Sequence, residues 1–211
     1  MDYLVKPIKS FVRRGVNRIA VWVNRVSRGR ITPDSVTLFG AAMHVPIALA
    51  IAFDRPYWAA GLLVVFGLFD ALDGSLARLQ ERASTSGMLL DASTDRVKEA
   101  VLYSGVAYLF VEQGQPAWAV ASVTLALGAS IIVSYVKAKG EAAIASVGHV
   151  IPHAKLNRMF ADGWFPFEVR MSLLVIGLVS GWLLAAVIVI AVGASVTIVQ
   201  RMILINRALR S

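Results

Sequence analysis

The sequence predicts an all-α integral membrane protein, in which six transmembrane helices follow a basic amphipathic helix at the membrane surface. Of the 211 residues, 57% are hydrophobic and only 16% are charged, and the mean hydropathy is +0.68. Several apolar runs approach the ~20 residues that span a bilayer as a helix. This composition excludes a soluble enzyme and a disordered chain. The formal net charge of +8 is assigned to cytoplasmic loops facing anionic lipids rather than to nucleic acid binding.

Residues 1–30 are expected to form the amphipathic helix. Eight basic residues are spread through this segment, and apolar residues recur at helical spacing between them, at positions 8, 12, 16, 19, 23 and 26. A signal peptide would need an uninterrupted apolar stretch after its basic start, so we expect the segment to be retained. The alternative is a solvated basic tail. Residues 31–211 are expected to form a single membrane domain.

The six predicted spans are separated by polar or turn-forming breaks. They cover residues 36–53, 57–79, 88–111, 116–137, 165–180 and 182–205. With both termini in the cytoplasm, all but Arg55 of the 21 Lys and Arg residues fall in or near the predicted inner segments. The positive-inside bias therefore predicts an N-in, C-in orientation in the cell membrane.

Four aspartates lie where a membrane helix normally avoids charge. Asp70 and Asp73 are three residues apart in the second span, and Asp91 and Asp95 are four apart in the third. Each pair therefore occupies one face of its helix. Intramembrane carboxylates are costly and mark a functional site by default. The all-oxygen set of side chains and the absence of Cys predict Mg²⁺ or Mn²⁺ near the cytoplasmic ends of these spans. The alternative is that the four acids form buried salt bridges without a metal function.

Glycines and a basic residue complete a longer pattern around these acids. Eight positions across 26 residues are fixed, in the order Asp70-x2-Asp73-Gly74-x2-Ala77-Arg78-x8-Gly87-x3-Asp91-x3-Asp95. This pattern resembles, position for position, the signature of the CDP-alcohol phosphatidyltransferase family. These membrane enzymes join a CDP-activated group to an alcohol and release CMP. The segment Thr32-Pro33-Asp34-x2-Thr37 also resembles a nucleotide-binding segment of the family, although it reads equally well as a helix start with Thr32 as N-cap.

The resemblance implies roles for individual residues. Two divalent ions would be held by Asp70, Asp73, Asp91 and Asp95, and Asp95 would also act as the general base. The nucleotide would be bound by Asp34, Thr37, Asp73, Gly74, Ala77, Arg78 and Gly87. The implied partners are a CDP-linked lipid, a phosphorylated polar alcohol and a second copy of the chain as a homodimer, with the active site at the cytoplasmic face.

The sequence identifies the acceptor alcohol less clearly than the metal-binding and nucleotide-binding residues. The chain resembles the phosphatidylinositol phosphate synthase branch in residues 87–96 and 134–141, and this resemblance implies inositol phosphate as acceptor. The phosphate of that acceptor would be bound by three basic residues at helix ends, Lys137, Arg170 and Arg201. Their alternative role is positive-inside anchoring. That branch typically carries two arginines three apart, whereas this chain has Phe167 before Arg170. Lys155 and Arg158 are possible substitutes.

Two other functions therefore remain open. Glycerol 3-phosphate is the alternative acceptor for the same chemistry. In a different class, the chain would be a divalent-cation carrier or a non-catalytic lipid-binding protein. A carrier needs acids along a path through both leaflets, but the acids here cluster toward one side.

Overall fold

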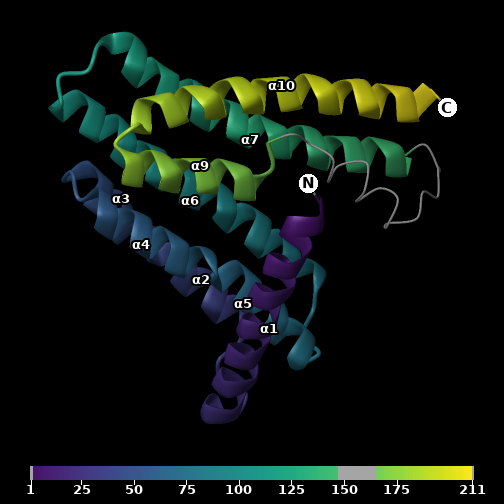
Figure 1. Cartoon of the computed structure of the whole chain (residues 1–211). Coiled ribbons are helices and arrows are strands. Elements are labelled where there is room, and N and C mark those ends of the chain that lie inside the picture. The colour runs from purple at the N-terminus through teal and green to yellow at the C-terminus, as the bar shows by residue number, and fades with distance from the viewer. Residues whose placement is uncertain (1, 147–164, 211) are drawn as a thin grey trace.

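The computed structural model describes residues 2–146 and 165–210, with side chains described over 13–146 and 165–209. Every regular element in these residues is an α-helix, which confirms the predicted all-α class. In chain order the helices are α1 (Asp2–Ser27), α2 (Pro33–Ala42), α3 (His44–Ala52), α4 (Pro56–Gly67), α5 (Phe69–Leu79), α6 (Thr85–Glu112), α7 (Ala117–Ser146), α9 (Phe167–Ser180) and α10 (Leu183–Arg210) (Figure 1).

The helices form a bundle in which sequence neighbours and distant segments pack together. The long helices α7 and α10 run side by side, and α9 packs against α10 and α4 (Figure 1). Helix α6 contacts α2, α3 and α7, so it passes through the middle of the bundle. Helix α1 crosses beside α5 at a steep angle to the other helices (Figure 1).

Within the described residues, four segments are long and apolar enough to cross a membrane: Pro33–Ala52, Pro56–Leu79, Ala117–Ser146 and Leu183–Leu209. The other two predicted spans are helical but differ for physical reasons. Helix α6 carries five charged residues between Asp91 and Glu99, which lowers its hydropathy, and α9 has only 14 residues. The number of six spans and the N-in, C-in orientation therefore stay predictions.

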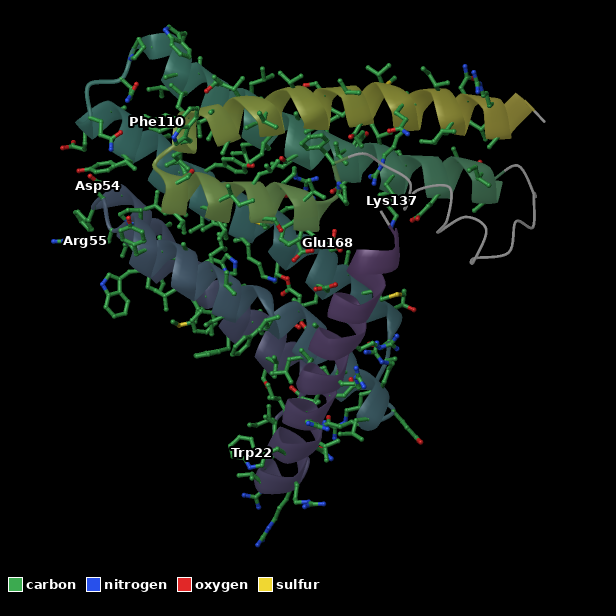
Figure 2. All side chains as sticks on the ribbon, in the orientation of Figure 1. Trp22, Asp54, Arg55, Phe110, Lys137 and Glu168 are labelled. Atoms are coloured by element: carbon green, nitrogen blue, oxygen red, sulfur yellow. The ribbon has the colours of Figure 1, made fainter. Side chains whose placement is uncertain are left out.

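The first two spans are each built from two helices rather than one continuous helix. The first is interrupted at Met43 and the second at Leu68. The break at Met43 has a clear cause, because Pro46 has no backbone N–H to donate to the carbonyl of Ala42 four residues earlier. Figure 2 shows Asp54 and Arg55 at the turn that joins these two spans, at the opposite end from α5.

Side-chain caps fix the starts of two helices that carry site residues. The Thr32 hydroxyl accepts a hydrogen bond from the Ser35 backbone N–H at 3.2 Å, and Pro33 occupies the first turn of α2. This confirms the predicted helix start. The Ser84 hydroxyl accepts from the Gly87 N–H at 3.1 Å at the start of α6. Both caps satisfy backbone donors that the first helical turn leaves unpaired.

Helix α1 meets the bundle along only part of its apolar side. Val16 and Ala20 are buried, whereas Ile19, Trp22 and Val26 are exposed, and Figure 2 shows Trp22 pointing away from the bundle. An apolar strip beside basic residues is typical of a helix that lies in a membrane interface. The amphipathic character is therefore visible in the structure, and its position on the membrane surface stays a prediction.

Candidate active site

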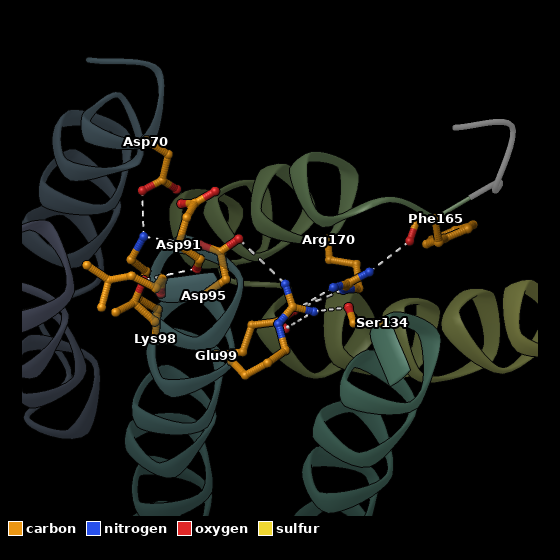
Figure 3. A network of polar contacts seen from close by, with 11 residues as sticks. Asp70, Asp91, Asp95, Lys98, Glu99, Ser134, Phe165 and Arg170 are labelled. Carbon is orange, nitrogen blue, oxygen red and sulfur yellow. Dashed lines mark hydrogen bonds and ion pairs between the residues drawn. The ribbon is translucent and has the colours of Figure 1, made fainter. Parts of the chain in front are cut away.

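Three carboxylates from two helices converge at the centre of the site. Asp70 comes from α5, and Asp91 and Asp95 come from α6 one turn apart. Each offers one oxygen, and these oxygens all lie within 4.8 Å of one another. Figure 3 shows the three carboxylates facing one another. We call them the aspartate triad. The sequence predicted four carboxylates together, but Asp73 is not a member of this group.

A lysine enters the aspartate triad from the side of α6. The Lys98 ammonium donates to Asp70 Oδ1 at 2.5 Å and to Asp95 Oδ1 at 3.1 Å (Figure 3). Its side chain is only 1% exposed. The lysine lies one turn after Asp95 on α6, so helical spacing alone brings those two residues together. The ion pair with Asp70 joins α5 to α6.

The third carboxylate is left without such a partner. Asp91 Oδ1 is buried and has no hydrogen-bond partner among the described residues. A buried carboxylate oxygen without a partner is expensive, and an oxygen-only cluster of this kind suits Mg²⁺ or Mn²⁺. The donor set therefore fits a divalent ion. The alternative considered from the sequence was a set of buried salt bridges. Such ion pairs account for Asp70 and Asp95 but not for Asp91.

A cavity of about 430 Å³ lies beside the triad, between the start of α2, the end of α5 and the start of α6. All seven residues that the sequence predicted for nucleotide binding line it, namely Asp34, Thr37, Asp73, Gly74, Ala77, Arg78 and Gly87. We call it the glycine cavity. A side chain at Gly87 would stand 3.2 Å from Ser84 Oγ and 3.7 Å from Asp34 Oδ1, so the glycine keeps this corner open.

Asp73 belongs to the glycine cavity rather than to the triad. Its Oδ2 accepts a hydrogen bond from the Thr37 hydroxyl at 2.5 Å, and Thr37 also donates toward the Pro33 carbonyl at 3.2 Å. This contact ties α5 to α2. The sequence singled out both residues but gave no sign that they would touch.

A larger cavity of about 680 Å³ lies on the other side of the triad. Asp70, Asp91 and Asp95 line this cavity, together with the polar residues His44, Glu168 and Ser172. Its apolar wall comes from α4 and α9 and includes Leu63, Val64, Val175 and Ile176. We call it the triad cavity. Asp91 lines both cavities, so the carboxylates stand at the junction between the two.

A second set of ion pairs continues from Asp95 toward α9. Arg96 pairs with Asp95 at 3.6 Å and with Glu99 at 3.1 Å, and it also contacts the Ser134 hydroxyl on α7. Glu99 Oε1 accepts from Arg170 Nε at 3.1 Å and from Nη2 at 2.7 Å. Glu99 is fully buried and Arg170 is 1% exposed. Figure 3 follows this network from α6 to α9.

The three predicted acceptor residues come from three helices and differ in environment. Arg170 is committed to Glu99 and also donates to the Phe165 carbonyl at 2.9 Å. Arg201 is buried and donates to the Val133 carbonyl at 2.8 Å. Lys137 is 41% exposed and lies 3.8 Å from Glu141. None of the three lines the triad cavity or the glycine cavity, so their acceptor role stays a prediction. Lys155 and Arg158 lie outside the described residues.

Phe167 occupies the position where the sequence resemblance led us to expect an arginine. Its ring centre lies 5.7 Å from the Arg96 guanidinium and 5.9 Å from that of Arg170, within cation–π distance of both. Phe167 and Glu168 both line the triad cavity. The aromatic ring thus lies against the guanidinium groups of two arginines, which the residue type alone did not predict.

Sequence comparisons identify relatives with a common chemistry. Residues 30–199 match the family model described as CDP-alcohol phosphatidyltransferase. The phosphatidylinositol phosphate synthase of Corynebacterium glutamicum is 31% identical over 191 residues, covering 85% of this chain and 80% of the relative. The enzyme of the same name from Cutibacterium acnes is 32% identical over 190 residues, covering 87% of this chain and 90% of the relative.

Solved structures agree with the sequence relatives. The Mycobacterium tuberculosis phosphatidylinositol phosphate synthase PgsA1 with CDP-DAG bound matches with a TM-score of 0.76 at 26% identity, covering 91% of this chain and 94% of that one. The structure of the same enzyme in complex with manganese and citrate gives a TM-score of 0.74 at 26% identity, with coverages of 90% and 88%. The family predicted from the sequence is thereby confirmed.

Proposed function

Because the chain belongs to the CDP-alcohol phosphatidyltransferase family, we propose that it transfers the phosphatidyl group of CDP-diacylglycerol to a hydroxyl of inositol phosphate and releases CMP. The observation that carries this proposal is the pair of cavities that share Asp91. A CDP-lipid has a polar nucleotide, a pyrophosphate and apolar tails in that order. The glycine cavity, the triad and the apolar wall of the triad cavity follow the same order.

The nucleotide end of the lipid belongs in the glycine cavity. Asp34 and Thr37 at the start of α2 face Gly74, Ala77 and Arg78 across this pocket. Small residues let the cytidine phosphate approach the backbone, and the Arg78 guanidinium offers paired donors to a phosphate. We assign Gly87 and Asp73 to the same nucleotide-binding surface.

The triad and Asp73 would hold two divalent ions, either Mg²⁺ or Mn²⁺, in the working complex. When bound, such ions neutralise charge on the pyrophosphate as the phosphoryl group transfers. A relative solved in complex with manganese supports divalent metal use. Asp91 is the carboxylate best placed to bridge the two halves of the site, because it lines both cavities.

Asp95 acts as the general base. Its carboxylate lines the triad cavity, where an acceptor hydroxyl would have to approach the lipid-side phosphorus. The carboxylate takes the hydroxyl proton as the oxygen attacks that phosphorus. A new phosphorus–oxygen bond forms to the acceptor, the pyrophosphate bond breaks, and CMP leaves with the electrons of that bond.

The acceptor phosphate would be bound by Lys137, Arg170 and Arg201. These residues come from α7, α9 and α10, and α10 packs against both of the other helices. Although Arg170 is committed to Glu99 and Phe165, Nη1 and Nη2 each carry a second proton for a phosphate oxygen. Curated relatives named phosphatidylinositol phosphate synthase support this acceptor.

The same proposal includes the membrane arrangement. We propose six transmembrane segments in residues 31–211, preceded by the basic surface helix of residues 1–30, with both termini and the active site at the cytoplasmic face. The basic residues around the triad end of the bundle favour this orientation. A homodimer of this chain is proposed with it.

Glycerol 3-phosphate is retained as the second acceptor, because Phe167 stands where the inositol phosphate branch carries an arginine. A non-catalytic divalent-cation or lipid-binding protein would use the same acids without turnover. One assay separates these functions. CMP release would be measured with purified protein, Mg²⁺ or Mn²⁺ and CDP-diacylglycerol, comparing inositol 1-phosphate, glycerol 3-phosphate, free inositol and serine.

We expect CMP release that depends on inositol 1-phosphate. Release only with glycerol 3-phosphate would retain the catalytic mechanism but replace the acceptor. If no acceptor supports release, the assay would be repeated with a CDP-linked ether lipid. Failure with both lipids would refute the enzymatic proposal.

A further inference from the structure

Lys98 is the one cation that forms ion pairs with two carboxylates of the aspartate triad in the part of the chain that the structure describes (Figure 3). Its ammonium contacts Oδ1 of Asp70 and Oδ1 of Asp95, and its side chain is 1% exposed. We propose that Lys98 is a built-in cation of the metal site: without nucleotide it fills one cation position, so the protein alone binds a single divalent ion. The second ion enters together with the pyrophosphate. This inference rests on the proposed function, because it takes the triad to be a metal site.

The first step of the argument is geometric. Nζ stands 2.5 Å from Asp70 Oδ1 and 3.1 Å from Asp95 Oδ1, and thus between a carboxylate of α5 and one of α6. A Mg²⁺ ion that bridged the same two oxygens would lie about 2.0–2.1 Å from each of them. That position overlaps the space of the ammonium. A divalent ion there therefore requires Lys98 to release at least one of its two carboxylates.

The second step concerns the oxygen that Lys98 leaves unsatisfied. Asp91 Oδ1 is buried without a hydrogen-bond partner among the described residues, although it belongs to the same triad. Asp70 and Asp95 each have a second carboxylate oxygen in addition to the one that contacts Lys98, and that of Asp95 lies 3.6 Å from Arg96 Nη2, beyond hydrogen-bond distance. These oxygens together with Asp91 provide ligands for one ion while the lysine stays in place.

The third step concerns charge. The triad and Asp73 together carry four formal negative charges. Lys98 offsets one of them, and the Arg96–Glu99–Arg170 set that contacts Asp95 carries a net charge of +1. One divalent ion offsets the remaining two. A second divalent ion would then enter a site with no net negative charge and would be repelled by the ammonium. The pyrophosphate of a CDP-linked substrate supplies the missing negative charge, so the second ion and the nucleotide bind together.

The test counts metal ions rather than turnover. Full-length protein in detergent micelles is titrated with Mn²⁺, and free Mn²⁺ is measured by electron paramagnetic resonance, first without nucleotide and then with saturating CDP. We expect the unaltered protein to bind one Mn²⁺ per chain alone and two with CDP. Two equally tight ions without nucleotide would overturn the proposal, and this result needs no variant.

Variants of Lys98 test whether its ammonium group limits the protein without nucleotide to one Mn²⁺. Lys98→Met keeps the apolar stem and removes the charge, and we expect two Mn²⁺ per chain without CDP and a half-saturating concentration lower by about tenfold or more. Lys98→Gln gives the same result if the methionine variant folds poorly. Lys98→Arg keeps the charge and should bind one ion. Lys139→Met on α7 is the matched control, because Lys139 is exposed and its ammonium lies 5.8 Å from the Tyr135 ring centre.

The outcomes separate this inference from the proposed function. Unchanged or weaker Mn²⁺ binding in both neutral Lys98 variants would reject Lys98 as a competing cation. Such a result would leave acceptor-dependent CMP release by the unaltered protein untouched. Complete absence of Mn²⁺ binding by the unaltered protein, with and without CDP, would reject the metal site and with it both proposals.

Discussion

Replacing Glu99 by glutamine tests whether the buried ion pairs between α6 and α9 hold the site together. Glu99 is 0% exposed and contacts Arg170 at 2.7 Å and Arg96 at 3.1 Å. Breaking a buried pair by neutralising one partner typically costs about 3–5 kcal/mol, because the other charge stays buried. Gln retains one acceptor oxygen and Arg96 is 23% exposed, so the lower end of that range applies.

The expected loss is large enough to measure in detergent. A cost of about 3 kcal/mol corresponds to a decrease in melting temperature of roughly 6–12 °C for a chain of this length. The assay is thermal denaturation followed by tryptophan fluorescence, with CMP release measured at a temperature at which both proteins are folded. Because Glu99 lines neither cavity, we expect the KM for the CDP-lipid to stay within about twofold.

Two comparisons make the result specific. Glu112→Gln changes an exposed acid at the C-terminal end of the same helix and should leave the melting temperature unchanged. The double variant Glu99→Gln/Arg170→Met should lose less than the sum of the two single losses, since the partners are coupled. If Glu99→Gln melted within about 2 °C of the unaltered protein, the pair would contribute little and our reasoning on α6 and α9 would be refuted.

Three further predictions address catalysis, nucleotide binding and helix packing. Asp95→Asn should abolish CMP release while CDP and Mn²⁺ binding persist, and normal turnover would remove Asp95 from the base role. Arg78→Met should raise the KM for the CDP-lipid by about 10- to 100-fold without changing the KM for the acceptor, whereas equal effects on both would place Arg78 outside the nucleotide site. Gly105→Ala should destabilise the protein by about 1–3 kcal/mol, because the new methyl group would meet the Ala48 carbonyl of α3, whereas Gly128→Ala has open space. Equal melting temperatures for these two variants would contradict this packing.

The features that the sequence predicted correctly depend on local spacing. Helical class, the Thr32 cap and the motif from Asp70 to Asp95 all involve residues within a turn or within a fixed short segment. All seven residues predicted for nucleotide binding line one cavity, because the adjoining ends of α2, α5 and α6 pack together, and their nucleotide-binding role stays a prediction. Helical periodicity also placed Asp91 and Asp95 on one face, which the triad requires.

The features that the sequence could not predict depend on how helices pack. Lys98 and Asp70 form an ion pair although they are 28 residues apart in the sequence, and Arg170 and Glu99 do so although they are 71 residues apart. Neither pair therefore follows from a helical repeat. The separation of Asp73 from the triad has the same origin: its rotation on α5 points it to Thr37 on α2. Span boundaries were less predictable because the charges that create the site also lower the hydropathy of α6.

The charges of the site form a chain of alternating sign, which explains how so many ionisable groups persist in an apolar bundle. The chain runs, from contact to contact, from Asp70 through Lys98, Asp95, Arg96 and Glu99 to Arg170. Three acids and three bases balance within it, so these residues need no ion to offset their formal charge. Asp73 and Asp91 lie outside the chain. Asp73 accepts a hydrogen bond from the neutral Thr37 hydroxyl, and a buried oxygen of Asp91 lacks a partner among the described residues. The unbalanced charge therefore lies on two acids that line the glycine cavity, one of which also lines the triad cavity, and this is where the proposed reaction needs metal ions.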